Sequence, residues 1–212
     1  MKLPRAILAD DHTLVAEALH GLIAAQFDVV ATVADGHALL ASALTLKPDV
    51  IVVDVAMPLL NGLEACRQLK QKMPGVKLVF LTMNEDPELA VEAMKSGASG
   101  YVLKKSAASE LLQAMQAALR GKSYLTPQIS RGMQESFIRN PQGRSHTKSL
   151  TARQREVVQL LAEGKSMKEA ASVLNVAPRT VAFHKYKMME GLGVKTSAEL
   201  IQFAIRNRVL VA

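Results

Sequence analysis

Apolar residues in the first 120 positions form short β-branched runs that alternate with longer stretches of helical periodicity. The runs typical of buried strands occupy five ranges: 6–9, 29–33, 50–53, 78–81 and 101–103. Strands that alternate with helices in this way are typical of a parallel sheet with helices on both faces. We therefore predict an α/β fold for residues 1–122, a doubly wound sheet of five parallel strands.

The pattern changes after residue 122. Helical periodicity fades, and residues 139–146 are polar and rich in turn formers, so we interpret residues 123–148 as a linker. No strand pattern follows, and helical patterns begin near Thr151, Ser166, Pro178 and Ser197. Residues 149–212 are therefore predicted to form a small all-helical second domain.

Capping signals support several of these helix starts. A polar residue that accepts a hydrogen bond from the first turn is expected at four places: Asn61 with Glu64, Asp86 before Pro87, Thr151 with Gln154, and Ser166 with Glu169.

Charge divides the chain as the hydrophobic pattern does. Residues 1–122 carry 12 Lys and Arg against 13 Asp and Glu, a net −1, whereas residues 123–212 carry 14 against 6, a net +8. A basic second part next to a near-neutral first part indicates a polyanionic partner for the second part. Charge alone leaves DNA, RNA and an anionic membrane open.

The chain has no apolar run near the roughly 20 residues that cross a bilayer, and its start lacks the apolar core of a signal peptide. The single Cys66 has no partner for an internal disulfide. We expect a cytoplasmic protein without a membrane partner.

Chemistry-bearing side chains follow four predicted strands. Asp10 and Asp11 come after the first strand, Asp54 after the third, Thr82 after the fourth and Lys104 after the fifth. Ligands of doubly wound sheets bind beyond the carboxyl ends of the strands. We expect all five side chains to meet at this edge.

Three carboxylates in one place repel one another and favour a cation, and oxygen ligands at an open edge suit Mg²⁺. We predict Asp10, Asp11, Asp54 and the carbonyl of Ala56 as metal ligands, with Asp10 acting through a water. A carboxylate is also a nucleophile towards phosphorus, and Lys104 would offset the charge of a transferred phosphoryl group.

The order of these elements resembles the receiver domain of response regulators. The resemblance rests on Asp10-Asp11, Asp54 to Pro58 with Gly62, Leu81-Thr82 and Gly100 to Lys104. It implies a flavodoxin-like sheet of order 2-1-3-4-5 and a sensor histidine kinase that phosphorylates Asp54. It also implies that Thr82 and Tyr101 shift on phosphorylation.

In the second domain, the predicted helix from Pro178 to Leu192 follows a short turn after another helix. Val181, Met188 and Leu192 form its apolar stripe, and Ala182, Phe183 and Tyr186 lie on the opposite side. Such a helix fits a DNA major groove. We predict phosphate contacts from the following residues: Arg179, Thr180, Lys187, Lys165 and Lys168.

Residues 150–210 resemble the LuxR-type helix-turn-helix of NarL/FixJ regulators, through Leu150-Thr151, Leu160 to Ser166, Thr180-Val181 and Leu192 to Val194. The resemblance implies a homodimer, formed on activation, at an inverted repeat in double-stranded DNA. Ala177, where the family has a serine cap, and Ala182, where a basic residue is common, depart from it and affect base preference.

Other functions fit the sequence less well. Aspartyl-phosphate phosphatases have a second Asp two residues after the nucleophile, where this chain has Ala56, so we expect no enzyme. The glycines that a nucleotide-binding loop requires before Gly121-Lys122-Ser123 and Gly164-Lys165-Ser166 are Gln116 and Gln159. A DNA-binding regulator that works without phosphate, with a receiver-like dimerisation domain, remains the alternative.

Overall fold

The computed structural model describes residues 2–139 and 150–206. The chain forms two compact units, Met1–Gly143 and Arg144–Ala212. Each unit has its own buried apolar residues.

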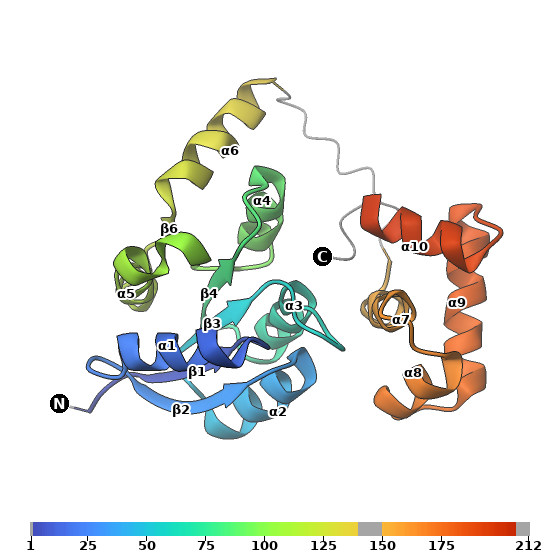
Figure 1. Cartoon of the computed structure of the whole chain (residues 1–212), viewed down its shortest axis with the longest axis horizontal. Coiled ribbons are helices and arrows are strands. Elements are labelled where there is room, and N and C mark those ends of the chain that lie inside the picture. The colour runs from blue at the N-terminus through green and yellow to red at the C-terminus, as the bar shows by residue number, and fades with distance from the viewer. Residues whose placement is uncertain (1, 140–149, 207–212) are drawn as a thin grey trace. The chain divides into compact units, whose positions relative to one another are not determined.

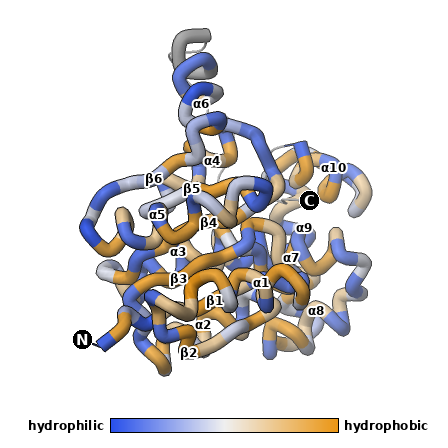
Figure 2. The backbone as a smooth tube through the Cα atoms, turned by 60° about the vertical axis from the view of Figure 1, so that its left-hand side comes forward, coloured by the Kyte–Doolittle hydropathy of each residue, from blue (hydrophilic) through white to orange (hydrophobic). Residues whose placement is uncertain are grey.

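The first unit is built on a parallel sheet (Figure 1). Its strands are β1 (Arg5–Ala9), β2 (Asp28–Val33), β3 (Val50–Asp54), β4 (Lys77–Thr82), β5 (Gly100–Leu103) and β6 (Tyr124–Leu125), in the order β2-β1-β3-β4-β5-β6. The predicted parallel α/β sheet and the order of its first five strands are confirmed. The tube in Figure 2 is mostly orange along the central strands, because both faces of these strands are buried.

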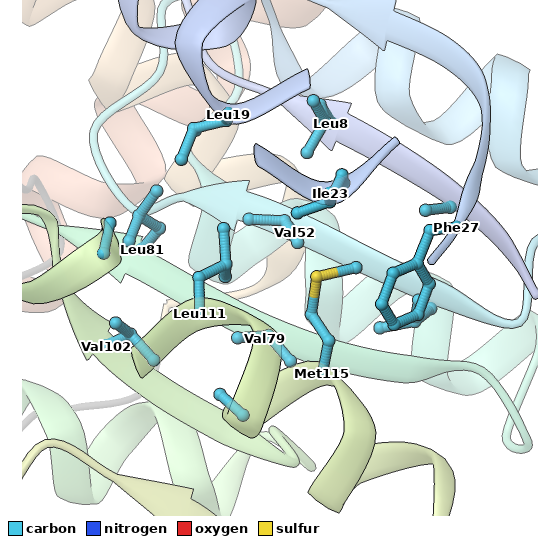
Figure 3. Close-up of a cluster of buried hydrophobic side chains, with 14 of the residues drawn as sticks. Leu8, Leu19, Ile23, Phe27, Val52, Val79, Leu81, Val102, Leu111 and Met115 are labelled. Carbon is cyan, nitrogen blue, oxygen red and sulfur yellow. The ribbon is translucent and has the colours of Figure 1, made fainter. Parts of the chain in front are cut away.

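Helices cover both faces of the sheet, with α1 and α5 on one face and α2, α3 and α4 on the other (Figure 1). Their bounds are α1 (Thr13–Ile23), α2 (Gly36–Leu46), α3 (Gly62–Lys72), α4 (Pro87–Lys95) and α5 (Ala107–Leu119), with a 3₁₀ turn η1 (Lys104–Ser106) before α5. Leu19 and Ile23 of α1 and Leu111 and Met115 of α5 pack onto the inner strands (Figure 3). This apolar core holds the strand ends at fixed positions.

The sheet has one strand more than predicted, and part of the predicted linker is folded. Residues 124–125 pair with β5 as β6, and α6 (Pro127–Arg139) follows directly. A two-residue strand is too short to show a period of two, and its backbone hydrogen bonds to Ser99 and Tyr101 depend on the rest of the sheet. The linker prediction for 123–148 is therefore wrong for residues 124–139, and residues 140–148 lie outside the described residues.

The second unit is all-helical, as predicted. Its helices are α7 (Ala152–Ala162), α8 (Met167–Val173), α9 (Pro178–Leu192) and α10 (Ser197–Arg206). Both predicted capping boxes are present: the side chains of Thr151 and Ser166 accept from the backbone of Gln154 and Glu169, which reach back in turn. The start of α9 differs, because Ala177 offers no side-chain cap.

No helix among residues 2–139 and 150–206 is both long enough and apolar enough to span a membrane.

Candidate functional site

Four strand ends bring polar side chains to one edge of the first unit. Asp10 follows β1, Asp54 ends β3, Thr82 ends β4 and Lys104 follows β5. The side chains of Asp10, Asp54 and Thr82 are almost fully buried, although polar groups are rarely buried without a partner. The contacts between them therefore decide what this site can do.

Lys104 joins two of the carboxylates. Its Nζ atom lies 2.7 Å from Oδ2 of Asp54 and 2.7 Å from Oδ2 of Asp10. Burial lowers the pKa of Lys104, but the two carboxylates outweigh it and raise the pKa above its usual value, so the ammonium stays charged. Burial raises the pKa of Asp54, and Lys104 offsets only part of that effect.

Asp11 and His12 complete the cluster at its exposed side. Nδ1 of His12 lies 3.0 Å from Asp11 Oδ1 and 3.2 Å from Asp10 Oδ1, and the backbone N–H of His12 donates to Asp10 at 3.0 Å. One ligand atom from each of Asp10, Asp11, His12 and Asp54 lies within 4.8 Å of the others. His12 is an addition to the predicted site, and its place beside Asp10-Asp11 in the sequence was the available signal.

The loop after β3 fixes the direction of Asp54. Its Oδ1 atom accepts a hydrogen bond from the N–H of Ala56 at 3.2 Å. The start of α3 lies so close to the strand end that a Cβ atom on Gly62 would stand 2.0 Å from the carbonyl oxygen of Asp54. Only glycine fits there, which explains Gly62 in the recognised motif. The predicted metal ligation by the Ala56 carbonyl stays a prediction.

Thr82 and Tyr101 are linked through the loop between β4 and α4. The hydroxyl oxygen of Thr82 accepts from the N–H of Asn84 at 3.0 Å, and the hydroxyl of Tyr101 donates to the carbonyl of Asn84 at 3.2 Å. Burial raises the pKa of Tyr101 above its usual range, so the phenol remains a donor. A movement of Thr82 therefore reaches the bond that holds Tyr101.

Charge at the cluster is unbalanced. The carboxylates of Asp10, Asp11 and Asp54 face the single ammonium of Lys104, which leaves an excess of two negative charges when all three are ionised. Oxygen atoms with this excess charge match a hard divalent cation. They also place a nucleophilic oxygen, that of Asp54, beside a cationic group that stabilises a transferred anion.

In the second unit, α9 presents an aromatic and basic face. Val181 and Met188 are buried, whereas Phe183 and Tyr186 are each 58% exposed. The Nζ atoms of Lys187 and Lys185 lie 5.5 Å from the ring centres of Phe183 and Tyr186, respectively. The predicted division of α9 into an apolar and an outer face matches this arrangement.

The other candidate DNA contacts lie along the same motif. Arg179 and Lys168 are exposed, and Thr180, Ala182 and Lys165 are half-buried. His184 is half-buried and packs edge-on against Phe183, with ring centres 5.5 Å apart. The DNA contacts of these residues stay predictions.

Two families cover most of the chain. Residues 6–116 match response regulator receiver domains, and residues 148–204 match bacterial regulatory proteins of the luxR family. The oxygen regulatory protein NreC of Staphylococcus aureus is 33% identical over 214 residues, which cover 97% of this chain and 99% of NreC.

Solved structures agree in both units. The response regulator RcsB of Salmonella typhimurium is 27% identical, with a TM-score of 0.60 over 96% of this chain and 98% of RcsB. A complex of RcsB with DNA gives a TM-score of 0.59 at 26% identity, over 95% of this chain and 98% of that chain.

Proposed function

Because the chain belongs to the response regulators that join a receiver domain to a LuxR-type DNA-binding domain, we propose that phosphorylation of Asp54 controls its binding to DNA. The chain is a two-component transcription factor, whose partners are of two classes, a histidine kinase and DNA. The observation that carries the assignment of Asp54 is its buried carboxylate, held between Lys104 and the N–H of Ala56.

In the proposed step, a carboxylate oxygen of Asp54 attacks the phosphorus of a phosphohistidine on the kinase. The new bond is O–P, the bond that breaks is N–P, and the imidazole leaves with its electron pair and takes up a proton. The charge of the phosphoryl group then faces Lys104, which is already held at 2.7 Å from Asp54. The receiver is thus an acceptor that changes its own state, and not an enzyme with a separate substrate.

Asp10, Asp11 and Asp54 fit a Mg²⁺ ion, because their oxygen atoms converge and their charge exceeds that of Lys104. The Ala56 carbonyl is our candidate for a neutral ligand. When bound, Mg²⁺ supplies positive charge that offsets the phosphoryl oxygens.

Thr82 is the residue that we expect to respond to the new charge, by forming a hydrogen bond to the phosphoryl group. Its hydroxyl oxygen accepts from the Asn84 N–H, and its hydrogen bond with the side chain of Tyr101 would be exchanged for one to the phosphoryl group. Donation to a phosphoryl oxygen would draw Thr82 towards Asp54 and shift the Asn84 carbonyl that holds Tyr101.

For the second unit we propose that α9 enters the DNA major groove. Phe183, Tyr186 and Ala182 would face base edges, and Arg179, Thr180 and Lys187 would contact phosphates, with Lys165 and Lys168 adding charge from α8. We further propose that the activated form is a homodimer on an inverted repeat.

Labelling with acetyl phosphate and Mg²⁺, read by intact-protein mass spectrometry, tests the central assignment. We expect one phosphoryl adduct on the wild type and on the control Asp28→Ala, whose carboxylate is exposed on β2, and none on Asp54→Ala. An adduct on Asp54→Ala would overturn the assignment. A wild type without any adduct would favour the phosphate-independent regulator.

A further inference from the structure

The β6–α6 segment, residues 124–135 in the part with described side chains, packs against the receiver. Ile129 is 1% exposed and Thr126 is 3% exposed. Thr126 accepts from the N–H of Leu103 at 3.2 Å and donates to Glu110 at 2.6 Å. The segment therefore covers the outer edge of β5, which would otherwise offer unpaired backbone groups.

Further along, α6 lies directly on the start of α4. A Cβ atom on Gly132 would stand 2.6 Å from Cγ of Pro87, so the two helices meet without room for a side chain. Figures 1 and 2 show that the far end of α6 projects away from its unit. A small tilt of α6 at its start would therefore move its far end by a larger distance than its start.

A polar bridge ties α6 to the loop that holds Thr82. Glu85, three residues after Thr82, accepts from Gln128 of α6 at 2.5 Å and pairs with Lys105. Lys105 follows Lys104, the residue that contacts Asp54. The hydrogen bond with Lys105 lowers the pKa of Glu85, so its carboxylate is charged at neutral pH.

We propose that the β6–α6 segment is a releasable cover, which Glu85 helps to hold and which undocks from α4 when Asp54 is phosphorylated. This inference rests on the proposed function. Recruitment of Thr82 to the phosphoryl group removes the acceptor of the Asn84 N–H and moves the loop that carries Glu85. Its bonds to Gln128 and Lys105 then break, and the surface of α4 and β5 is uncovered.

Amide hydrogen exchange of residues 127–135 in the full chain tests this proposal, with and without beryllium trifluoride and Mg²⁺. We expect exchange in the wild type to rise about tenfold with the phosphoryl mimic, equivalent to about 1.4 kcal/mol of lost local stability. The variant Gly132→Leu, which forces α6 off Pro87, should exchange fast in both conditions. Gln134→Ala, at an exposed position of α6, should behave as the wild type.

Gln128→Ala keeps the proposal testable if Gly132→Leu does not fold. It removes only the exposed bond to Glu85, so it should raise the exchange of the free protein by less than the mimic does. The acetyl phosphate adduct is measured on the same samples. Loss of that adduct would overturn the proposed function itself. A normal adduct with unchanged exchange in residues 127–135 would overturn the cover alone.

Discussion

Asp54 combines two demands that oppose each other. It has to be buried so that its position is fixed, and it has to be ionised to bind a cation or attack phosphorus. Burial and the nearby charge of Asp10 raise its pKa, whereas Lys104 and the hydrogen bond from the Ala56 N–H lower it. The ionisation of Asp54 depends on the balance of these effects, and cation binding by the site should therefore depend on pH.

As the pH is lowered, we expect the Mg²⁺ affinity of the receiver to weaken at a higher pH than it would with an unperturbed aspartate. A carboxyl with a raised pKa keeps its proton to higher pH, and the protonated form does not bind the cation. An unperturbed aspartate titrates near about 3.9. Calorimetric titration between neutral and acidic pH should thus show weakening well above that value, and a constant affinity down to about pH 4.5 would contradict it.

Replacement of Lys104 by Met should destabilise the first unit. It leaves the buried carboxylates of Asp10 and Asp54 without their shared cation, at a cost of about 2–3 kcal/mol in the free energy of unfolding. Added Mg²⁺ should restore part of that loss, because it binds only the folded form. Urea denaturation with and without Mg²⁺ measures both effects.

Lys105→Met is the matched control, since Lys105 pairs with Glu85 at an exposed position. Exposed pairs contribute little, so we expect a much smaller loss of stability than for Lys104→Met. Equal losses in the free energy of unfolding for the two variants would show that the contacts of Lys104 with Asp10 and Asp54 stabilise the fold no more than an exposed ion pair does.

At the scale of elements, α9 lacks a side-chain cap at its start. Ala177 leaves the first-turn N–H groups without a side-chain acceptor, whereas α7 and α8 both have capping boxes. Ala177→Ser should raise the stability of the second unit by about 1 kcal/mol. Chemical denaturation checks this prediction. The control Ala198→Ser, at an exposed position of α10, should lower the free energy of unfolding by only a few tenths of a kcal/mol. A destabilised Ala177→Ser would contradict the capping argument.

DNA binding by α9 should separate phosphate contacts from base contacts. Arg179→Ala should reduce the slope of log affinity against log salt by about 1, because one fewer counterion is released. Phe183→Ala should weaken binding and leave the slope unchanged. Titrations over a salt series, monitored by fluorescence anisotropy, distinguish the two. Identical slopes for Arg179→Ala and the wild type would remove Arg179 from the phosphate contacts.

Elements with strong periodicity or capping signals were predictable from the sequence. The five long strands and the caps at Asn61 and Asp86 are local properties, and the structure has them. β6 depends on hydrogen bonds to β5 and has no clear local pattern. In α6, by contrast, Ile129, Met133 and Phe137 recur at helical spacing, a pattern that the interpretation of residues 123–148 as a linker overlooked. Pro127 at the first position of α6 was an available signal.

The candidate site followed from the same logic. Strand ends placed Asp10, Asp54, Thr82 and Lys104 together without any knowledge of side-chain positions. The links that pass through the β4–α4 loop were not predictable. The bond from Tyr101 to the Asn84 carbonyl and the bridge from Glu85 to Gln128 join residues far apart in sequence, and only the packed fold shows them.

For the whole molecule, the division of charge matches the division into units. The acidic site lies in a near-neutral unit, and the surplus of positive charge lies in the unit with the helix-turn-helix. In the proposed function, a signal arrives as negative charge at Asp54 and has to reach the second unit through a change in the first. Phosphorylation adds about −1.5 to −2 charges at neutral pH, which is enough to reorganise Thr82 and Lys104 around it.

The most direct test of this account is the affinity of the full chain for an operator fragment selected from random DNA, measured at fixed salt with and without phosphodonor. We predict that acetyl phosphate and Mg²⁺ tighten binding of the wild type and leave Asp54→Ala unchanged. Equal affinity of wild type and Asp54→Ala in the presence of phosphodonor would contradict the claim that Asp54 controls DNA binding.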